Sequence, residues 1–253
     1  MTSSLTRAVE VVELLAASPN GLSVTELADM MSISKSTSSR LLAALLDAGL
    51  VERDDAQRHF LDVRFWNWGM QAARRLAFLD VARPHVASVV KNRSVSVFMA
   101  VARGDQTIYV SSTVPHEGHA LASLVSYVVP VYACAPGKAI LAHSRPELIE
   151  AILSGPLTRF TPKTLATREE LAAELLRIRS QGYALNRGEY YENGRLAIAA
   201  PLLDQSGWPV AAICFFAIQD EEAVDELVQP LLELASTISA SLGYSRPMRE
   251  LVG

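Results

Sequence analysis

The chain has 253 residues, half of them hydrophobic, and a formal net charge of −4 at neutral pH. This length accommodates a small N-terminal module and a larger domain. Because it has no run of about 18 uncharged apolar residues and no basic-then-apolar N-terminus, we expect neither a membrane span nor secretion. Cys134 and Cys214 lie far apart and outside metal-ligand spacing, which fits reduced thiols in a cytoplasmic protein without a metal site.

The N-terminal 61 residues have the pattern of a winged helix-turn-helix module. Ser23 and Glu26 have the spacing of a reciprocal capping pair that starts a short helix, and Ser34 starts a second helix that ends at Gly49. Two short strands around a polar turn follow. This order is typical of modules that place the second helix of the pair in the major groove of DNA. The predicted elements are a helix at 4–17, helices opening at Ser23 and Ser34, and strands at 50–52 and 58–61.

The charge of this module is unusual for a DNA-binding surface. Residues 1–62 hold five basic and nine acidic side chains. Four of the five basic residues fall on the second helix of the pair or on the wing, and their distribution matters more than the sum. Residues 63–93 then hold six basic residues and one acidic residue. We therefore expect phosphate contacts from this basic connector, and specific binding by a dimer with weak non-specific affinity.

The outward face of the helix that begins at Ser34 offers the groups that read DNA, because lysine, arginine and hydroxyl side chains reach base edges and phosphates. Arg40 suits a guanine or a phosphate, and the sequence does not separate the two. For Ser36 and Ser38, a role in plain capping and solvent exposure is weighed equally with a contact to DNA. Arg53 has Glu52 and Asp54 as alternative partners. The predicted DNA-binding residues are Ser34, Lys35, Ser36, Thr37, Ser39, Arg40 and, on the wing, Arg58.

A helix at 64–80 is expected to connect the module to the rest of the chain. Phe65 and Trp68 lie on its apolar stripe, which indicates a seam buried against its own domain or against a second subunit. A further helix is expected to follow Pro84 and to end near Asn92. Strand pairs interleaved with helices then predict an α+β architecture whose C-terminal domain has a mainly antiparallel sheet flanked by helices. The predicted domains are 1–63, 64–80 and 81–253.

Three motifs follow one another along the chain. The first is the helix and wing at 35–53, the second is Pro130-Val-Tyr-Ala-Cys-Ala-Pro-Gly-Lys-Ala-Ile-Leu-Ala142, and the third runs from Gly182 to Gly207. With these motifs in this order, the whole chain resembles the IclR family of bacterial transcriptional regulators. The resemblance implies an N-terminal winged helix, a linker helix, a GAF-like domain that binds a small-molecule effector, and a homodimer or dimer of dimers on double-stranded operator DNA.

The resemblance also implies an effector cavity, whose residues carry over by motif position. Gly137 stands at a helix start, where backbone N–H groups and the helix dipole favour an anion. Asn186 replaces an acidic residue of better-known members, which removes a charge that repels anions, and Arg195 suits a carboxylate if the strand register turns it inward rather than outward. We therefore expect a small organic or aromatic acid. The predicted effector-binding residues are Leu121, Val129, Ala135, Gly137, Asn186, Arg195, Ala197 and Cys214.

Other chemistry-bearing residues have weaker interpretations. An enzyme on the GAF-like domain would use Cys134 or Cys214 as a nucleophile, although a buried small hydrophobe is the simpler role for Cys134. The two histidines at 116–119 lack a third metal ligand. Glu189 and Glu192 fit a solvated loop over the pocket better than an acid–base pair. The main prediction is a ligand-responsive DNA-binding regulator of a catabolic or metabolic operon, with repression favoured over activation, and without enzymatic activity or a cofactor.

Overall fold

The computed structural model describes residues 4–93, 95–115, 127–191, 195–218 and 220–245. The chain forms two compact units, Met1–Leu76 and Ala77–Gly253, and each is described by itself. No helix in the described parts of the chain is long and apolar enough to cross a membrane.

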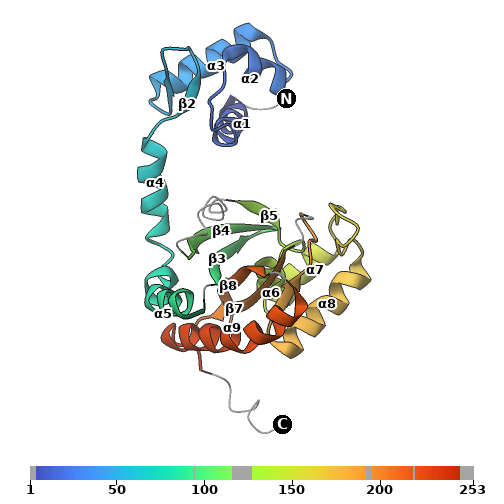
Figure 1. The fold of residues 1–253 in the computed structure, drawn as a ribbon. Helices are drawn as coiled ribbons and strands as arrows, with labels where there is room; N and C mark the ends of the chain where they lie inside the picture. The colour runs from blue at the N-terminus through green and yellow to red at the C-terminus, as the bar shows by residue number, and fades with distance from the viewer. Residues whose placement is uncertain (1–3, 94, 116–126, 192–194, 219, 246–253) are drawn as a thin grey trace. The chain divides into compact units, whose positions relative to one another are not determined.

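Unit 1 contains the predicted helix-turn-helix and wing, followed by one more helix (Figure 1). Its core joins apolar side chains of the three N-terminal helices and the first strand, among them Val11, Leu27, Leu42, Leu45 and Val51. The elements are α1 Ser4–Ala16, α2 Val24–Met30, α3 Lys35–Asp47, β1 Val51–Arg53, β2 His59–Leu61 and α4 Arg64–Ala73.

The helix boundaries of the module are set by the predicted local signals. The Ser23 N–H donates to Glu26 Oε2 at 2.8 Å, and the Glu26 N–H donates to Ser23 Oγ at 3.2 Å, which confirms the capping pair. Gly49 follows α3 with φ +67°, and a Cβ atom there would meet the Arg64 guanidinium. The positive φ favours glycine, whereas the Arg64 side chain could move, so the backbone conformation sets this stop and α3 ends where the sequence predicted.

The wing is tied to the loop between α1 and α2. β1 and β2 pair antiparallel, with Arg53 opposite His59. Leu22 adds an isolated bridge, since its N–H donates to the His59 carbonyl at 3.0 Å and its carbonyl accepts from the His59 N–H at 2.8 Å. The wing is therefore fixed to the start of the helix pair by backbone hydrogen bonds.

The prediction of one helix at 64–80 is wrong, because α4 ends at Ala73 and a separate helix, α5, spans Phe78–Arg93. Pro84 lies inside α5 rather than before it. No glycine or proline marks the break, and the helical spacing of apolar residues continues through it. The break separates the two units, and the buried residues of α5 from Phe78 onward pack in unit 2.

Unit 2 is built on a six-stranded antiparallel sheet, as predicted for the α+β domain (Figure 1). The strand order is β5-β4-β3-β8-β7-β6. β3 and β4 form a hairpin around Gly104, which has φ +60°. The elements after α5 are β3 Ser96–Arg103, β4 Gln106–Thr113, β5 Val128–Pro130, α6 Ala135–Ala142, α7 Pro146–Leu153, α8 Arg168–Gln181, β6 Ala184–Asn186, β7 Leu196–Leu203, β8 Pro209–Ile218 and α9 Glu221–Ser241.

Helices cover both faces of this sheet. Ala212 and Cys214 of β8 belong to the core cluster around α6, whereas the alternate residues Ile213 and Phe215 are buried but lie outside that cluster. Successive residues of a strand point to opposite faces, so β8 serves two buried layers. α6 occupies one layer with α7 and α8 beside it, and α5 and α9 pack on the other (Figure 1).

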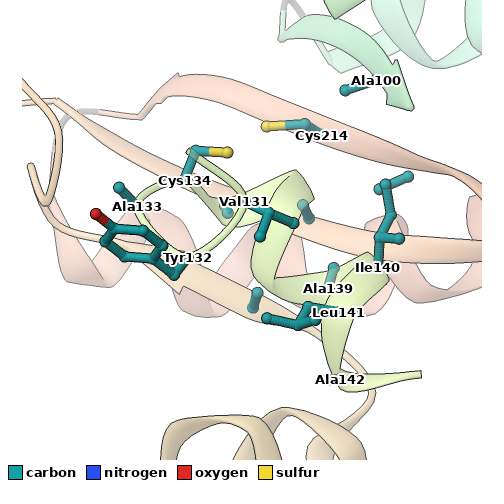
Figure 2. Close-up of a cluster of buried hydrophobic side chains, with 14 of the residues drawn as sticks. Ala100, Val131, Tyr132, Ala133, Cys134, Ala139, Ile140, Leu141, Ala142 and Cys214 are labelled. Atoms are coloured by element: carbon teal, nitrogen blue, oxygen red, sulfur yellow. The ribbon is translucent and has the colours of Figure 1, made fainter. Parts of the chain in front are cut away.

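Helix α6 lies at the centre of its layer, and all eight of its residues are buried. Figure 2 shows Ala139, Ile140 and Leu141 of α6 in the same cluster as Cys214 of β8. The approach is closest at Gly137, where a Cβ atom would collide with the Val131 carbonyl and the Thr107 hydroxyl. Close packing at this point therefore requires glycine.

Candidate functional site

The first candidate site is the exposed face of α3 in unit 1. Lys35, Ser36, Ser39 and Arg40 are exposed, while the opposite face of the helix lies in the core. Side chains three and four residues apart share one helix face, so these polar groups form a single surface. The geometry fits the prediction that this face reads DNA, and the individual contacts stay predictions.

Hydroxyl groups in the first turn of α3 have two different roles. Ser34 Oγ accepts from the Thr37 N–H at 3.2 Å and lies 3.0 Å from Ser36 Oγ, so it caps the helix. Ser38 is fully buried, and its hydroxyl donates to the Val24 carbonyl at 2.9 Å. Neither alternative given for Ser38, a DNA contact or a capping and solvent-exposed role, fits this buried side chain, whose bond holds α3 against α2.

Arg58 makes its visible contacts inside unit 1. Its Nε donates to the Asn20 carbonyl at 2.7 Å, and its Nη2 donates to the Gly21 carbonyl at 2.7 Å. The same Nη2 lies 3.1 Å from Glu26 Oε2. This guanidinium therefore ties the wing to the turn before α2 and to the capping pair, a role that the sequence did not suggest. Its contact with DNA stays a prediction.

The predicted apolar stripe of α4 is not fully buried in unit 1, since Trp68 is about half exposed and Phe65 is half-buried. Trp66, which is 73% exposed, and Met70, which is half exposed, lie off that stripe. Phe65 and Trp68 make an edge-to-face contact with ring centroids 5.5 Å apart, within the helix itself. The sequence predicted that this seam packs against its own domain or against a second subunit. Because the core of unit 1 does not bury it, we carry forward the second subunit as the partner.

The second candidate site is a cavity of about 370 Å³ in unit 2. Its walls come from strands on both sides of the sheet centre, from the turn before α6 and from the loop after β6. Most of the lining is apolar or aromatic, and the most polar side chains are Asn186 and Arg195. The lining residues are Tyr109, Tyr127, Val129, Ala133, Cys134, Ala135, Asn186, Tyr190, Tyr191, Arg195, Ala197 and Phe216.

Most of the predicted effector-binding residues meet in this cavity. Arg195 lines it, so the inward alternative for this residue fits the structure. Leu121 lies outside the described residues. Gly137 and Cys214 are buried and do not belong to the lining. The predicted residues that do line the cavity are Val129, Ala135, Asn186, Arg195 and Ala197.

Packing explains why Gly137 and Cys214 do not line the cavity. Gly137 is pressed against Val131 and Thr107, so protein atoms rather than the cavity surround it. Cys214 points into the layer between the sheet and α6 (Figure 2), where its thiol lies 3.6 Å from the Phe215 carbonyl.

The aromatic wall is the main feature that the sequence did not predict. Tyr190 and Tyr191 stand in the loop after β6, and Tyr190 packs on Phe160 with ring centroids 4.7 Å apart. Two consecutive tyrosines in an otherwise polar loop were the available signal. Tyr109 and Phe216 come from β4 and β8 and meet only through the sheet pairing, which the sequence alone does not give.

Asn186 is held by three hydrogen bonds at the edge of the cavity. Its Nδ2 donates to the Ala133 carbonyl at 3.0 Å and to Glu189 Oε2 at 3.2 Å. Its Oδ1 accepts from the Gly188 N–H at 2.9 Å. Both amide hydrogens are therefore directed at protein acceptors, and one lone pair of the oxygen is left.

A buried ionic cluster supports this arrangement. Lys138 of α6 is fully buried, and its ammonium donates to Glu189 Oε1 at 2.7 Å, to the Leu185 carbonyl at 2.8 Å and to Glu174 Oε1 at 3.2 Å. Three donors thus meet three acceptors. The prediction of a solvated loop is wrong for Glu189, which is only 6% exposed and whose pKa is raised by burial. Glu192 lies outside the described residues.

The cysteines lack the features of a nucleophile. Burial raises the pKa of Cys134 to about 11 and raises that of Cys214 as well. A reactive cysteine needs a lowered pKa, because the thiolate is the attacking species. The described residues also contain no cluster of three or more potential ligands for a metal ion. The two histidines at 116–119 lie outside that part of the chain.

Known proteins share this sequence and this fold. Residues 4–55 match the family described as IclR helix-turn-helix domain, and residues 70–240 match the family described as Bacterial transcriptional regulator IclR C-terminal. The HTH-type transcriptional regulator BhcR of Paracoccus denitrificans is 30% identical over 83% of this chain and 75% of its own. The DNA-binding transcriptional repressor YiaJ of Escherichia coli is 29% identical over 96% of this chain and 89% of its own.

A solved structure extends the likeness to the whole fold. It is an IclR homolog from Microbacterium hydrocarbonoxydans complexed with 4-hydroxybenzoate, which is 27% identical to this chain with a TM-score of 0.80. The match covers 96% of this chain and all of the homolog. The two family matches together span most of the sequence, in the order helix-turn-helix and then C-terminal domain. The chain belongs to the IclR family of bacterial transcriptional regulators.

Proposed function

We propose that this protein is a cytoplasmic transcriptional repressor whose affinity for operator DNA is controlled by a small aromatic acid. The observation that carries the proposal is the cavity in unit 2, which joins aromatic walls to a single arginine. Such a cavity suits a ligand with an apolar ring and one anionic group. The raised pKa of Cys134 supports a binding role rather than an enzymatic one.

The effector class follows from the chemistry of the lining. Five aromatic side chains offer stacking and edge contacts to a planar ring. Arg195 supplies a planar fork of donors that matches a carboxylate. The complex of the Microbacterium hydrocarbonoxydans homolog with 4-hydroxybenzoate supports the same class by analogy. We therefore assign a carboxylate to the Arg195 side and an aromatic ring to the tyrosine side.

For DNA binding, the two copies of α3 in a dimer would contact the operator. Exposed Lys35 and Arg40 on one helix face suit phosphates and guanine edges. The exposed apolar side chains of α4, led by Trp66 and Met70, suit burial against a second chain, because solvent exposure of large apolar side chains in a row marks an interaction surface. A dimer or dimer of dimers would place two recognition helices on successive half-sites.

The effector test is isothermal titration calorimetry with benzoate and its neutral analogue benzamide. We expect benzoate to bind more tightly, and the Arg195→Gln variant to lose that difference, because the substitution removes the guanidinium charge. Equal binding of the acid and the amide by the unaltered protein would refute the acid class. Benzoate is also expected to weaken binding to the upstream DNA of the protein's own gene in a band-shift assay, as repression relieved by an effector requires.

The DNA test compares Arg40→Ala with Arg103→Ala, an exposed arginine of unit 2 that bonds to the carbonyl of its own neighbour. We expect Arg40→Ala to weaken operator binding and, if Arg40 contacts a phosphate, to reduce the salt slope by about one. Arg103→Ala should leave both unchanged. Operator binding that is unaffected by Arg40→Ala would remove α3 from the proposed interface.

A further inference from the structure

The loop after β6 connects the buried ionic cluster to the cavity. Glu189 receives the Lys138 ammonium on one carboxylate oxygen at 2.7 Å and the Asn186 amide on the other at 3.2 Å. The Glu189 carbonyl also accepts from the Thr164 hydroxyl at 2.6 Å. Side chain and backbone of Glu189 are therefore fixed from two directions, and the next two residues of the loop line the cavity.

This arrangement allows the Asn186 amide only one orientation. In the observed sense, its NH₂ group faces a carbonyl and a carboxylate, and its oxygen faces the Gly188 N–H. Turning the amide over would set oxygen against two acceptors and NH₂ against a donor. The remaining hydrogen-bonding capacity of Asn186 is one oxygen lone pair, so any further hydrogen bond of this side chain to a ligand is one that it accepts.

We infer that Glu189 is a positioning residue that makes the cavity select effectors with a hydrogen-bond donor on the ring, such as a hydroxyl or amino group. This inference rests on the proposed function, which supplies the aromatic acid. Hydroxyl groups of the tyrosines rotate and serve as donor or acceptor, so they do not discriminate. Asn186 is held by Glu189 together with the Ala133 carbonyl and the Gly188 N–H. Glu189 is in turn held by Lys138, so the acceptor is fixed.

Charge around the cluster leaves the carboxylate of the effector to Arg195. Glu174, a second acidic partner of Lys138, is also paired with Arg177 at 2.8 Å. The charges of the two cations, Lys138 and Arg177, balance those of the two carboxylates, Glu174 and Glu189. Glu189 is the carboxylate that bonds to Asn186 in the cavity lining. An effector carboxylate placed beside Asn186 would meet a second carboxylate there, whereas a hydroxyl or amino group would find an acceptor.

The test measures dissociation constants by calorimetry for benzoate, the 3- and 4-hydroxybenzoates, 4-aminobenzoate and the corresponding methoxybenzoates. Methoxy groups retain the oxygen and lose the donor. We expect at least one hydroxy acid to bind about tenfold more tightly than its methoxy analogue and than benzoate, the worth of one well-formed hydrogen bond. Equal affinities for hydroxy and methoxy acids would overturn the inference and leave the proposed function standing.

The decisive variant is Glu189→Gln. A glutamine must present its oxygen to the Lys138 ammonium, which has no acceptor of its own, so its NH₂ group would face the NH₂ group of Asn186. The Ala133 carbonyl and the Gly188 N–H still hold the Asn186 amide, but repulsion between the two NH₂ groups disturbs it, so the tenfold preference should fall severalfold. A tenfold preference that is unchanged in this variant would overturn the inference. Glu150→Gln, a matched change at an exposed glutamate of α7, should keep the wild-type preference.

Asn186→Ala provides a second route if Glu189→Gln does not fold. It removes the acceptor itself, so the affinities for each hydroxy acid and its methoxy analogue should become about equal, whatever the change in the affinity for benzoate. Thermal melting and operator binding establish that each variant is folded. If the unaltered protein binds no aromatic acid although it binds its operator, the proposed effector class fails, and the inference fails with it.

Discussion

The two candidate sites are built in different ways. The DNA-binding face of unit 1 comes from one helix, and its polar side chains are exposed because the spacing of α3 turns them away from the core. The cavity of unit 2 takes its lining from five strands, a turn and a loop, and Asn186 in that lining is fixed by buried partners. One site depends on helical periodicity, whereas the other depends on how the whole domain packs.

This difference predicts different costs of substitution. A residue on the exposed face of α3 should change DNA affinity without changing stability. A residue behind the cavity should change stability first, because its partners are buried with it. Four pairs of matched variants test this contrast, in order of decreasing effect.

The largest effect is expected for Lys138→Met. Removing the ammonium leaves Glu189 and Glu174 buried without their cation, so the free energy of unfolding should fall by about 3–5 kcal/mol. Lys35→Met, on the exposed face of α3, should change it by less than about 0.5 kcal/mol while weakening DNA binding. Urea unfolding followed by circular dichroism measures both. Similar losses in the two variants would break the proposed contrast.

A smaller loss is expected for Gly137→Ala. The added methyl group collides with the Val131 carbonyl, which is backbone and cannot rotate away, so overpacking should cost about 1–3 kcal/mol in the free energy of unfolding. The matched variant is Gly69→Ala in α4, where a Cβ atom meets nothing within 4 Å. Because alanine favours a helix over glycine, that variant should gain up to about 1 kcal/mol. Thermal melting of both proteins would show the opposite signs.

Local signals explain why much of the fold could be predicted. Capping at Ser23 and the glycine stop at Gly49 depend on a few neighbouring residues, so the sequence contains them in full. The break before Phe78 depends instead on where two units separate. It has no local mark, and the prediction ran through it.

The cavity illustrates the same limit. Val129 and Ala197 were placed by motif position, but the aromatic wall was not, because Tyr109 and Phe216 meet only through strand pairing. Glu189 was assigned to solvent because its buried partner, Lys138, is 51 residues away in the sequence. Partners at such distances are set by the tertiary fold, and the residues alone do not reveal them.

Neighbouring serines of α3 give a finer test within one helix. Ser38→Ala removes a buried hydrogen bond to the Val24 carbonyl, so the free energy of unfolding should fall by about 1 kcal/mol. Ser39→Ala changes an exposed side chain on the DNA face, so its stability should stay within about 0.5 kcal/mol and its effect should appear in operator affinity. Denaturant unfolding and band shifts on the same two proteins separate these outcomes. A stability loss at Ser39 would contradict the division of the helix into two faces.

The smallest effect concerns pH and a contact in unit 1 between Glu26 and Arg58, which are distant in the sequence. The Ser23 backbone N–H and the Arg58 guanidinium bind the Glu26 carboxylate and, with the nearby Ser23 hydroxyl, hold its pKa below the ordinary value of 4.5. A carboxyl with a lower pKa in the folded protein stabilises the fold above its ordinary pKa, and the benefit is lost as the pH falls through the folded value.

Glu26→Gln keeps an oxygen for Ser23 and loses the charge. Its melting temperature should therefore be lower than that of the unaltered protein near neutral pH, and the gap should close below pH 4.5. Glu10→Gln, at an exposed position of α1, is the control and should show no such convergence. A gap that stays constant with pH would mean that Glu26 acts through its shape alone, and that the tie from Arg58 adds no electrostatic stability.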